Sequence, residues 1–190
     1  MAVPSLILAS ASPRRRDLLR AHGYQFTVRV PEVEEIAPAH LTPAEVTLAN
    51  ARLKAQAVAR RQPGALVVGA DTVVAFAGEI FGKPRDLDHA VEMLRRLNGC
   101  VHEVWSGVWL VHGETGQETG FNEVTRVRFR RLEDAQLHAY LARIGPLDKA
   151  GAYAAQDDQG ELIDAYEGCF DNVVGLPMKS LAWALERIAG

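Results

Sequence analysis

Asp71 is the residue whose surroundings in the sequence point most directly to chemistry. It lies inside a long apolar stretch, between the strand-like runs Ala65–Val68 and Val73–Phe76. An ionised carboxylate in such a place costs free energy unless it is paired with a cation or bound to a metal. Asp71 therefore has two interpretations: an aspartate at a strand end that caps a turn, or a metal ligand or general base that activates water.

Three consecutive arginines, Arg14–Arg16, occupy the first turn of a helix expected to begin at Pro13. Cations are unfavourable at this end because of the helix dipole. A bound anion would relieve this effect and accept hydrogen bonds from the free backbone N–H groups, and the planar guanidinium suits phosphate oxygens. The alternative is a solvated basic turn.

Two lysines and an acidic pair complete the candidate set. Lys54 lies in an expected helix, Lys83 stands in a Gly-Lys-Pro sequence that would fix its direction, and Glu34 and Glu35 are adjacent. Taken singly, each is compatible with an ordinary surface residue. Together, basic side chains that neutralise phosphates and acids that hold a metal ion are the components of a polyphosphate site.

Other common catalytic motifs are absent from the sequence. There is no G-x-G-x-x-G, H-E-x-x-H or G-x-S-x-G, and residues 78–84 lack the spacing and the Ser or Thr of a P-loop. Cys100 and Cys169 are too few for a four-thiolate zinc site or a disulfide framework. The formal net charge of -3 argues against a dedicated nucleic-acid binder, which is usually basic.

The elements that must position these residues alternate between strands and helices. The expected strands are Ser5–Ala9, Ala65–Val68 with Val73–Phe76, Glu79–Phe81, Val101–Val111, Glu123–Phe129 and Asn172–Val174, and the expected helices begin at Pro13, Thr42, Asp86, Leu132 and after Pro177. Hairpins beside strand–helix alternation indicate an α/β protein with a mixed, twisted sheet flanked by helices.

Two patterns predict which faces are buried. In the second helix, the recurring apolar residues are Val46, Ala49, Leu53 and Ala57, with Lys54 beside this stripe. In the strand Glu123–Phe129, arginines alternate with apolar residues, which favours a solvated sheet face over a binding surface.

The sequence carries no sign of membrane insertion or export. No segment is long and apolar enough to span a bilayer, and the stretch from Met1 to Ser10 has no basic leader. We therefore expect a cytoplasmic protein without a membrane partner, whose first residues form a strand.

The ordered motifs of the chain resemble those of the Maf family of nucleotide pyrophosphatases over essentially the whole length. The matching stretches are LASASPRRRDLL, VEE, ARLKAQAVA, VVGADTVV, GKPRD, LDKAGAYAAQ and NVVGLP. The resemblance implies that residues 1–190 form one domain with an elongated fold, similar to that of the inosine-triphosphate pyrophosphatases. It also implies two lobes around a central cleft that binds the nucleotide.

The resemblance also implies an activity, the hydrolysis of the α–β phosphate bond of a nucleoside triphosphate with a divalent cation such as Mg2+, Mn2+ or Co2+. Asp71 matches the catalytic carboxylate that accepts a proton from water, and Glu35 is interpreted as its partner in holding the metal. The residues that match phosphate-binding positions are Ser10, Arg15, Lys54 and Lys83.

Three further positions match the branch of the family that prefers dTTP and UTP: Arg14, Thr72 and Gln156. A glutamine amide has both a donor and an acceptor, which suits the O4 and N3–H edge of thymine or uracil. The chain departs from its relatives at Ala154-Ala155, Asp157-Asp158 and Cys169-Phe170. The first two departures flank the expected base-reading loop.

Three other functions remain to be weighed. The same reaction could act on CTP or 7-methyl-GTP, or the chain could be a non-catalytic nucleotide-binding regulator of cell division. A nucleic-acid-binding role for the arginines conflicts with the acidic total and the lack of interleaved aromatic residues. The resemblance makes a homodimer possible, although no interface is evident in the sequence.

Overall fold

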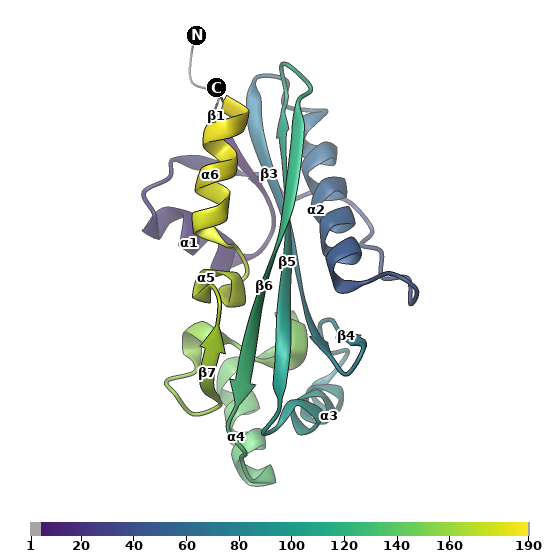
Figure 1. Cartoon of the computed structure of the whole chain (residues 1–190), viewed down its shortest axis with the longest axis vertical. Helices are drawn as coiled ribbons and strands as arrows, with labels where there is room; N and C mark the ends of the chain where they lie inside the picture. The colour runs from purple at the N-terminus through teal and green to yellow at the C-terminus, as the bar shows by residue number, and fades with distance from the viewer. Residues whose placement is uncertain (1–4, 190) are drawn as a thin grey trace. The chain divides into compact units, whose positions relative to one another are not determined.

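A mixed β-sheet runs through the chain, and the computed structural model describes residues 5–189 of it (Figure 1). The sheet order is β2-β1-β3-β5-β6-β7, and β4 pairs with β3. The strands are β1 (Ser5–Ala9), β2 (Phe26–Val28), β3 (Ala65–Phe76), β4 (Glu79–Phe81), β5 (Val101–His112), β6 (Glu118–Phe129) and β7 (Ile163–Glu167). β1 is parallel to β2 and β3, whereas β4 and β7 are antiparallel to their partners, so the predicted mixed sheet is confirmed.

Helices connect the strands at most of the predicted positions. They are α1 (Pro13–Ala21), α2 (Pro43–Ala59), α3 (Leu87–Leu97), α4 (Asp134–Ile144), α5 (Phe170–Val174) and α6 (Met178–Ala189). Thr42 forms the predicted capping box with Glu45, and Asp86 caps α3 by accepting a hydrogen bond from the N–H of His89. Short 3-10 turns fill much of the glycine-containing stretch between α4 and β7.

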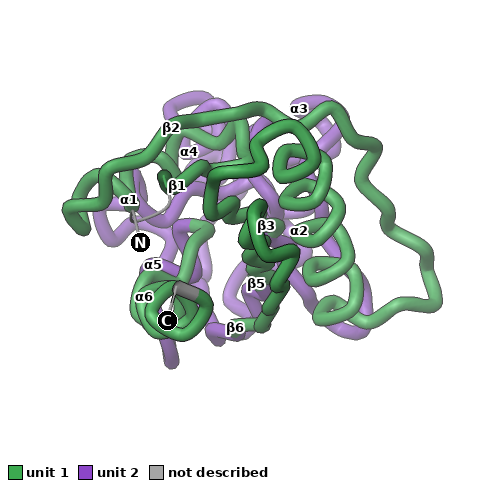
Figure 2. The backbone as a smooth tube through the Cα atoms, turned by 90° about the horizontal axis from the view of Figure 1, so that it is seen from above, with its two compact units in different colours: residues 1–71, 106–123, 175–190 green, residues 72–105, 124–174 purple. Residues whose placement is uncertain are grey.

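The chain divides into two compact units, which Figure 2 shows in different colours. Unit 1 consists of residues 1–71, 106–123 and 175–190, and unit 2 of residues 72–105 and 124–174. The long strands β3, β5 and β6 each contribute residues to both units. The predicted nucleotide cleft between two lobes stays a prediction.

In unit 1, α2 packs closely on the sheet because small residues face each other. A Cβ at Gly69 would lie 2.2 Å from the carbonyl oxygen of Ala51, and a Cβ at Gly107 would lie 2.4 Å from the backbone of Thr47. The apolar residues buried in this layer are Ile7, Ala9, Ala55, Val58, Ala59, Ala65, Val67 and Val111. Glycine at these two sheet positions is therefore a steric requirement for the helix to approach.

The predicted apolar stripe of α2 is wrong in part. Leu53 is exposed and Ala49 and Ala57 are half-buried, whereas Lys54 lies on the buried face. The buried residues of α2 are Val46, Thr47, Asn50, Ala51, Lys54, Ala55, Val58 and Ala59. Because α2 lies so close to the two sheet glycines, the helix face that is buried there carries small and polar residues. The bulky Leu53 lies on the exposed face.

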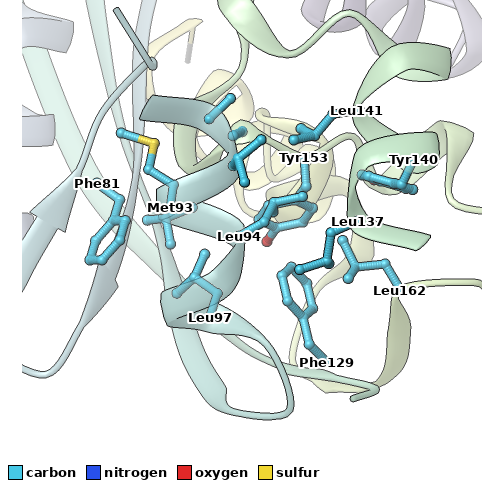
Figure 3. Packing of buried hydrophobic residues seen from close by; sticks show 14 of the residues in the cluster. Phe81, Met93, Leu94, Leu97, Phe129, Leu137, Tyr140, Leu141, Tyr153 and Leu162 are labelled. Carbon is cyan, nitrogen blue, oxygen red and sulfur yellow. The ribbon is translucent and has the colours of Figure 1, made fainter. Parts of the chain in front are cut away.

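The core of unit 2 is built from larger side chains of α3, α4 and the adjoining strands. Figure 3 shows side chains of these elements, among them Leu94, Leu137 and Phe129, gathered around the ring of Tyr153. The inward residues predicted for α3, namely Ala90, Val91, Leu94 and Leu97, are all buried. This core supports the loop that contains Gln156.

Several predicted strand boundaries are wrong. β3 is continuous through residues 69–72, so Asp71 lies inside a strand and not at its end. Residues 172–174 belong to α5, because the buried Asn172 amide donates to the carbonyl of Val104 and the hydroxyl of Thr125. β7 was not predicted, since its sequence IDAYE shows little apolar alternation.

The predictions for the arginines of the sheet and for membrane-spanning helices agree with the structure of residues 5–189. Arg126 and Arg128 on β6 and Arg130, which follows its last residue, are exposed, as predicted for a solvated sheet face. In the part of the chain from residue 5 to 189, no helix is long and apolar enough to cross a membrane. The first four residues of the predicted N-terminal stretch lie outside the described residues.

Candidate active site

Asp71 is a buried carboxylate on β3, with a relative exposure of 6%. One carboxylate oxygen, Oδ1, accepts a hydrogen bond from Lys54 Nζ at 2.7 Å. The other, Oδ2, accepts one from Asn50 Nδ2 at 3.2 Å. Both donors come from α2, where they are four residues apart and therefore on one helix face. Donors on both oxygens fix the orientation of the carboxylate, and the interpretation of Asp71 as a turn cap is wrong.

Lys54 lies between two carboxylates. Its Nζ is 2.7 Å from Asp71 Oδ1 and also 2.7 Å from Glu35 Oε1. The side chains of Lys54 and Asp71 are 9% exposed, whereas that of Glu35 is 50% exposed. The interpretation of Lys54 as an ordinary surface lysine is therefore wrong. The contact places one acid deep in the site and the other at its solvent-facing side.

Arg15 is buried beside the same carboxylate and is held mainly by backbone oxygens. Its Nε donates to the carbonyl of Gly175 at 2.8 Å, and its Nη1 donates to the carbonyl of Ala70 at 2.9 Å and to Ser10 Oγ at 3.2 Å. Burial lowers the pKa of the Arg15 guanidinium, an effect opposed by the charge of Asp71. Arginine nevertheless stays protonated in proteins, so it is a fixed positive charge next to Asp71.

The hydroxyl of Ser10 joins the end of β1 to the start of α1. Ser10 Oγ accepts hydrogen bonds from Arg15 Nη1 and from the backbone N–H of Ser12 at 3.1 Å. Pro13 begins α1, where its missing N–H is not needed. This turn buries Arg15 while Arg14 and Arg16 remain half-buried, so the solvated-turn interpretation is wrong for Arg15.

Unit 1 therefore brings together Ser10, Arg15, Glu35, Lys54 and Asp71. The other predicted residues of the site lie elsewhere. Arg14 is next to Arg15 on α1, whereas Thr72, Lys83 and Gln156 belong to unit 2. There, Lys83 and Gln156 are exposed and Thr72 is half-buried in β3.

Within unit 2, the turn that carries Lys83 is joined to the loop that carries Gln156. The N–H of Gly151 donates to the carbonyl of Gly82 at 3.0 Å. Two buried tyrosines hold the same loop: Tyr140 Oη accepts from the N–H of Ala154 at 3.1 Å, and Tyr153 Oη is 3.0 Å from His102 Nε2. The loop before Gln156 is therefore anchored by backbone and side-chain contacts.

The family comparison gives a clear result for almost the whole chain. Residues 5–188 match the Maf-like protein family. The chain belongs to the Maf-like protein family. This agrees with the resemblance of its ordered motifs.

Three relatives of this Maf-like chain bear the same name, dTTP/UTP pyrophosphatase. The protein from Pelotomaculum thermopropionicum is 44% identical over 182 residues, 96% of this chain and 95% of the relative. The protein from Symbiobacterium thermophilum is 49% identical over 91% of this chain and 88% of its own. The one from Salinibacter ruber is 46% identical over 93% and 87%.

Two acids of this Maf-like site, Glu35 and Asp71, are of the residue type that could supply oxygen ligands to a divalent cation. Glu35 and Asp71 both contact one nitrogen atom, so their oxygens converge on a common position. Among residues 5–189, no three acidic, histidine or cysteine side chains group as metal ligands. Mg2+ is commonly held by one or two carboxylates, with phosphate oxygens and water completing the shell. Each carboxylate oxygen has two lone pairs, so contacts with Lys54 and Asn50 leave further acceptor capacity.

Sequence reasoning missed Asn50, which is part of the same hydrogen-bond network in this Maf-like protein. Its side chain contacts Asp71 and is 3% exposed. A signal was present: Thr47, Asn50 and Lys54 are polar residues at spacings of three and four, which place them on one helix face. Polar residues on the buried face of a helix require partners, and here Asp71 is a partner of two of them.

Proposed function

We propose that this chain hydrolyses dTTP and UTP to the nucleoside monophosphates and pyrophosphate. The observation that carries the proposal is the buried Asp71, held by Lys54 and Asn50 and next to Glu35 and Arg15. Relatives named dTTP/UTP pyrophosphatase cover most of the chain at 44–49% identity, which supports the same activity here.

In the proposed reaction, Asp71 accepts a proton from a water molecule as the water oxygen attacks the α-phosphorus. A new P–O bond forms, the bond from the α-phosphorus to the bridging oxygen breaks, and pyrophosphate leaves with that oxygen. The fixed orientation of Asp71 suits this role because a general base must point at the proton that it accepts. Arg15, Lys54, Lys83 and Ser10 are proposed to bind phosphate oxygens, where positive charge stabilises the transition state.

Glu35 and Asp71 are proposed to hold a divalent cation, Mg2+, Mn2+ or Co2+. Such an ion would neutralise charge on the phosphate oxygens and so make the α-phosphorus easier to attack. The contact of both carboxylates with Lys54 places the two acids in one cluster, which supports this assignment. Removal of divalent ions by EDTA is expected to abolish pyrophosphate release, and restoration by Mg2+ is the control.

Base preference is assigned to Arg14, Thr72 and Gln156. The exposed amide of Gln156 is free to offer a donor and an acceptor to the O4 and N3–H edge of thymine or uracil. The loop N–H groups of Gly151 and Ala154 donate hydrogen bonds to the Gly82 carbonyl and to Tyr140 Oη, which supports a fixed position for the loop. Modified pyrimidine nucleotides are proposed as further substrates, because the family resemblance implies them.

A substrate panel tests the proposal. Pyrophosphate release is measured with dTTP, UTP, CTP, GTP and 7-methyl-GTP, each with and without EDTA. We expect dTTP and UTP to be hydrolysed fastest. Faster turnover of CTP or 7-methyl-GTP would contradict the base assignment, and no turnover of any nucleotide would favour a binding regulator of cell division.

We further propose that the chain works on free nucleotides in the cytoplasm and not on nucleic acid. Exposed arginines of β6 are engaged in ion pairs, Arg128 with Asp164 at 2.7 Å and Arg126 with Glu167 at 3.7 Å, which argues against a free basic surface. A homodimer remains a prediction from the family, and light scattering during size-exclusion chromatography tests it.

A further inference from the structure

The segment that carries Glu35 has no regular secondary structure. It belongs to the connection between β2, which ends at Val28, and α2, which begins at Pro43. Its backbone therefore lacks the hydrogen bonds that a helix or a strand of the sheet would provide within itself. A metal ligand in such a segment needs other contacts to hold it within reach of Asp71.

Contacts from α2 provide this positioning. Asn50 Oδ1 accepts the N–H of Ile36 at 2.8 Å, and Asn50 Nδ2 donates to the carbonyl of Ile36 at 2.9 Å. One amide side chain thus pairs with both backbone groups of the residue that follows Glu35, as a neighbouring strand would. Lys54 adds the contact with the Glu35 carboxylate itself.

Asn50 also contacts the catalytic carboxylate. The same Nδ2 that binds the carbonyl of Ile36 is 3.2 Å from Asp71 Oδ2. An amide nitrogen carries two hydrogens, so it can donate to both oxygens at once. Asn50 and Lys54 of α2, which packs on Gly69 of β3, thus each link Asp71 to the segment that carries Glu35, Asn50 through the backbone of Ile36 and Lys54 through the Glu35 carboxylate.

We infer that Asn50 is a positioning residue that keeps Glu35 and Asp71 close enough together to bind one divalent cation. This inference rests on the proposed function, since it gives a role to a residue next to the proposed base and metal ligands. Among the described residues, the side-chain hydrogen bonds of Asn50 go to Ile36 and Asp71, and not to the three residues assigned to the base. Its loss is therefore expected to weaken metal binding and lower kcat more than it changes KM.

The test replaces Asn50 by leucine, whose side chain has the same number and branching of heavy atoms and no hydrogen-bonding group. Thr47→Val is the matched control: Thr47 is buried one turn earlier on α2, and its hydroxyl bonds to Pro43, Ala44 and Asn122 instead of the site. Both variants lose a buried polar group from the same helix. Asn50→Ala is the second variant, used if leucine prevents folding.

The first readout is independent of catalysis. Hydrogen exchange of the Ile36 amide, measured by NMR, is expected to accelerate in Asn50→Leu and to keep its wild-type rate in Thr47→Val. The second readout is binding of Mn2+ in the presence of α,β-imido-dTTP, which is not cleaved. Loss of a residue that orients metal ligands typically weakens affinity about 10- to 100-fold, and we expect this for Asn50→Leu alone.

The third readout is turnover of dTTP at saturating Mn2+, where kcat is expected to fall about 10- to 100-fold while KM changes less than about threefold. Unchanged Ile36 exchange, or Mn2+ affinity and kcat equal to those of Thr47→Val, would overturn the inference. If the wild type hydrolyses no nucleotide, the proposed function fails, but Ile36 exchange and Mn2+ binding still decide whether Asn50 positions the two acids.

Discussion

Replacing Asp71 by asparagine tests the role of Asp71 as a base while leaving the shape of the side chain almost unchanged. The amide has nearly the same shape as the carboxylate but cannot accept a proton from water. A positioned general base contributes a factor of about 10² to 10⁴ in rate, so kcat for dTTP is expected to fall by at least about 100-fold. Binding of α,β-imido-dTTP is expected to persist, because Arg15 and Lys54 keep their charges.

The effect of Asp71→Asn on stability follows from the contacts of Lys54. Removing one member of a buried ion pair costs about 3–5 kcal/mol when the other charge is left without a partner. Here Lys54 retains Glu35 at 2.7 Å, and that side chain is half-exposed, so the loss is expected to be smaller. We estimate about 2 kcal/mol, close to the contribution of one hydrogen bond to a charged group. For a chain of this length this corresponds to a fall in Tm of about 4–8 °C.

Glu35→Gln is the matched variant, because it removes the other carboxylate that contacts Lys54 at the same distance. Its activity is expected to recover at high Mg2+, since the residue is assigned to metal binding alone. Asp71→Asn is expected to stay inactive at any Mg2+ concentration. Pyrophosphate release over a Mg2+ titration and scanning calorimetry make the comparison. Turnover of Asp71→Asn at the wild-type rate would refute the proposed mechanism.

Three further predictions concern packing, base recognition and pH. Gly69→Ala places a Cβ 2.2 Å from the carbonyl oxygen of Ala51, so urea denaturation is expected to show a loss of about 3 kcal/mol. Gln156→Glu removes a donor from the proposed base edge and is expected to lower kcat/KM for UTP about tenfold, the equivalent of one hydrogen bond. Burial lowers the pKa of His102 to about 4, so its unfolded form binds a proton more readily. Stability is then expected to fall by about 2 kcal/mol from pH 7 to pH 5 in urea denaturation, and less in His102→Gln.

The sequence was sufficient for most of the helices and strands and for the most unusual charges. Asp71 could be found because an acid inside an apolar stretch needs a partner, and Arg15 because three arginines begin a helix. The capping residues Thr42 and Asp86 marked two helix starts correctly. These patterns involve residues that are close in sequence, so they can be recognised without knowledge of the tertiary structure.

What escaped prediction depends on contacts between distant segments. Residues 172–174 contain two valines and resemble a strand, but the Asn172 amide bonds to Val104 and fixes a helical turn. Glu35 could not be distinguished from Glu34 by composition, because its role depends on the approach of its segment to α2. In both cases tertiary hydrogen bonds outweigh local preference.

The polar residues on the buried face of α2 are best explained by their contacts with the proposed active site. A helix that served only to cover the sheet would bury a stripe of large apolar residues, and Leu53 would face inward. Instead, Leu53 is exposed while Asn50 and Lys54 are buried, which costs free energy unless both have partners. Asp71 is the partner that they share, and Glu35 and the backbone of Ile36 complete the contacts of the ammonium and the amide. The polar face of α2 and the acid on β3 therefore depend on each other, and this dependence is the structural reason to place the chemistry at Asp71.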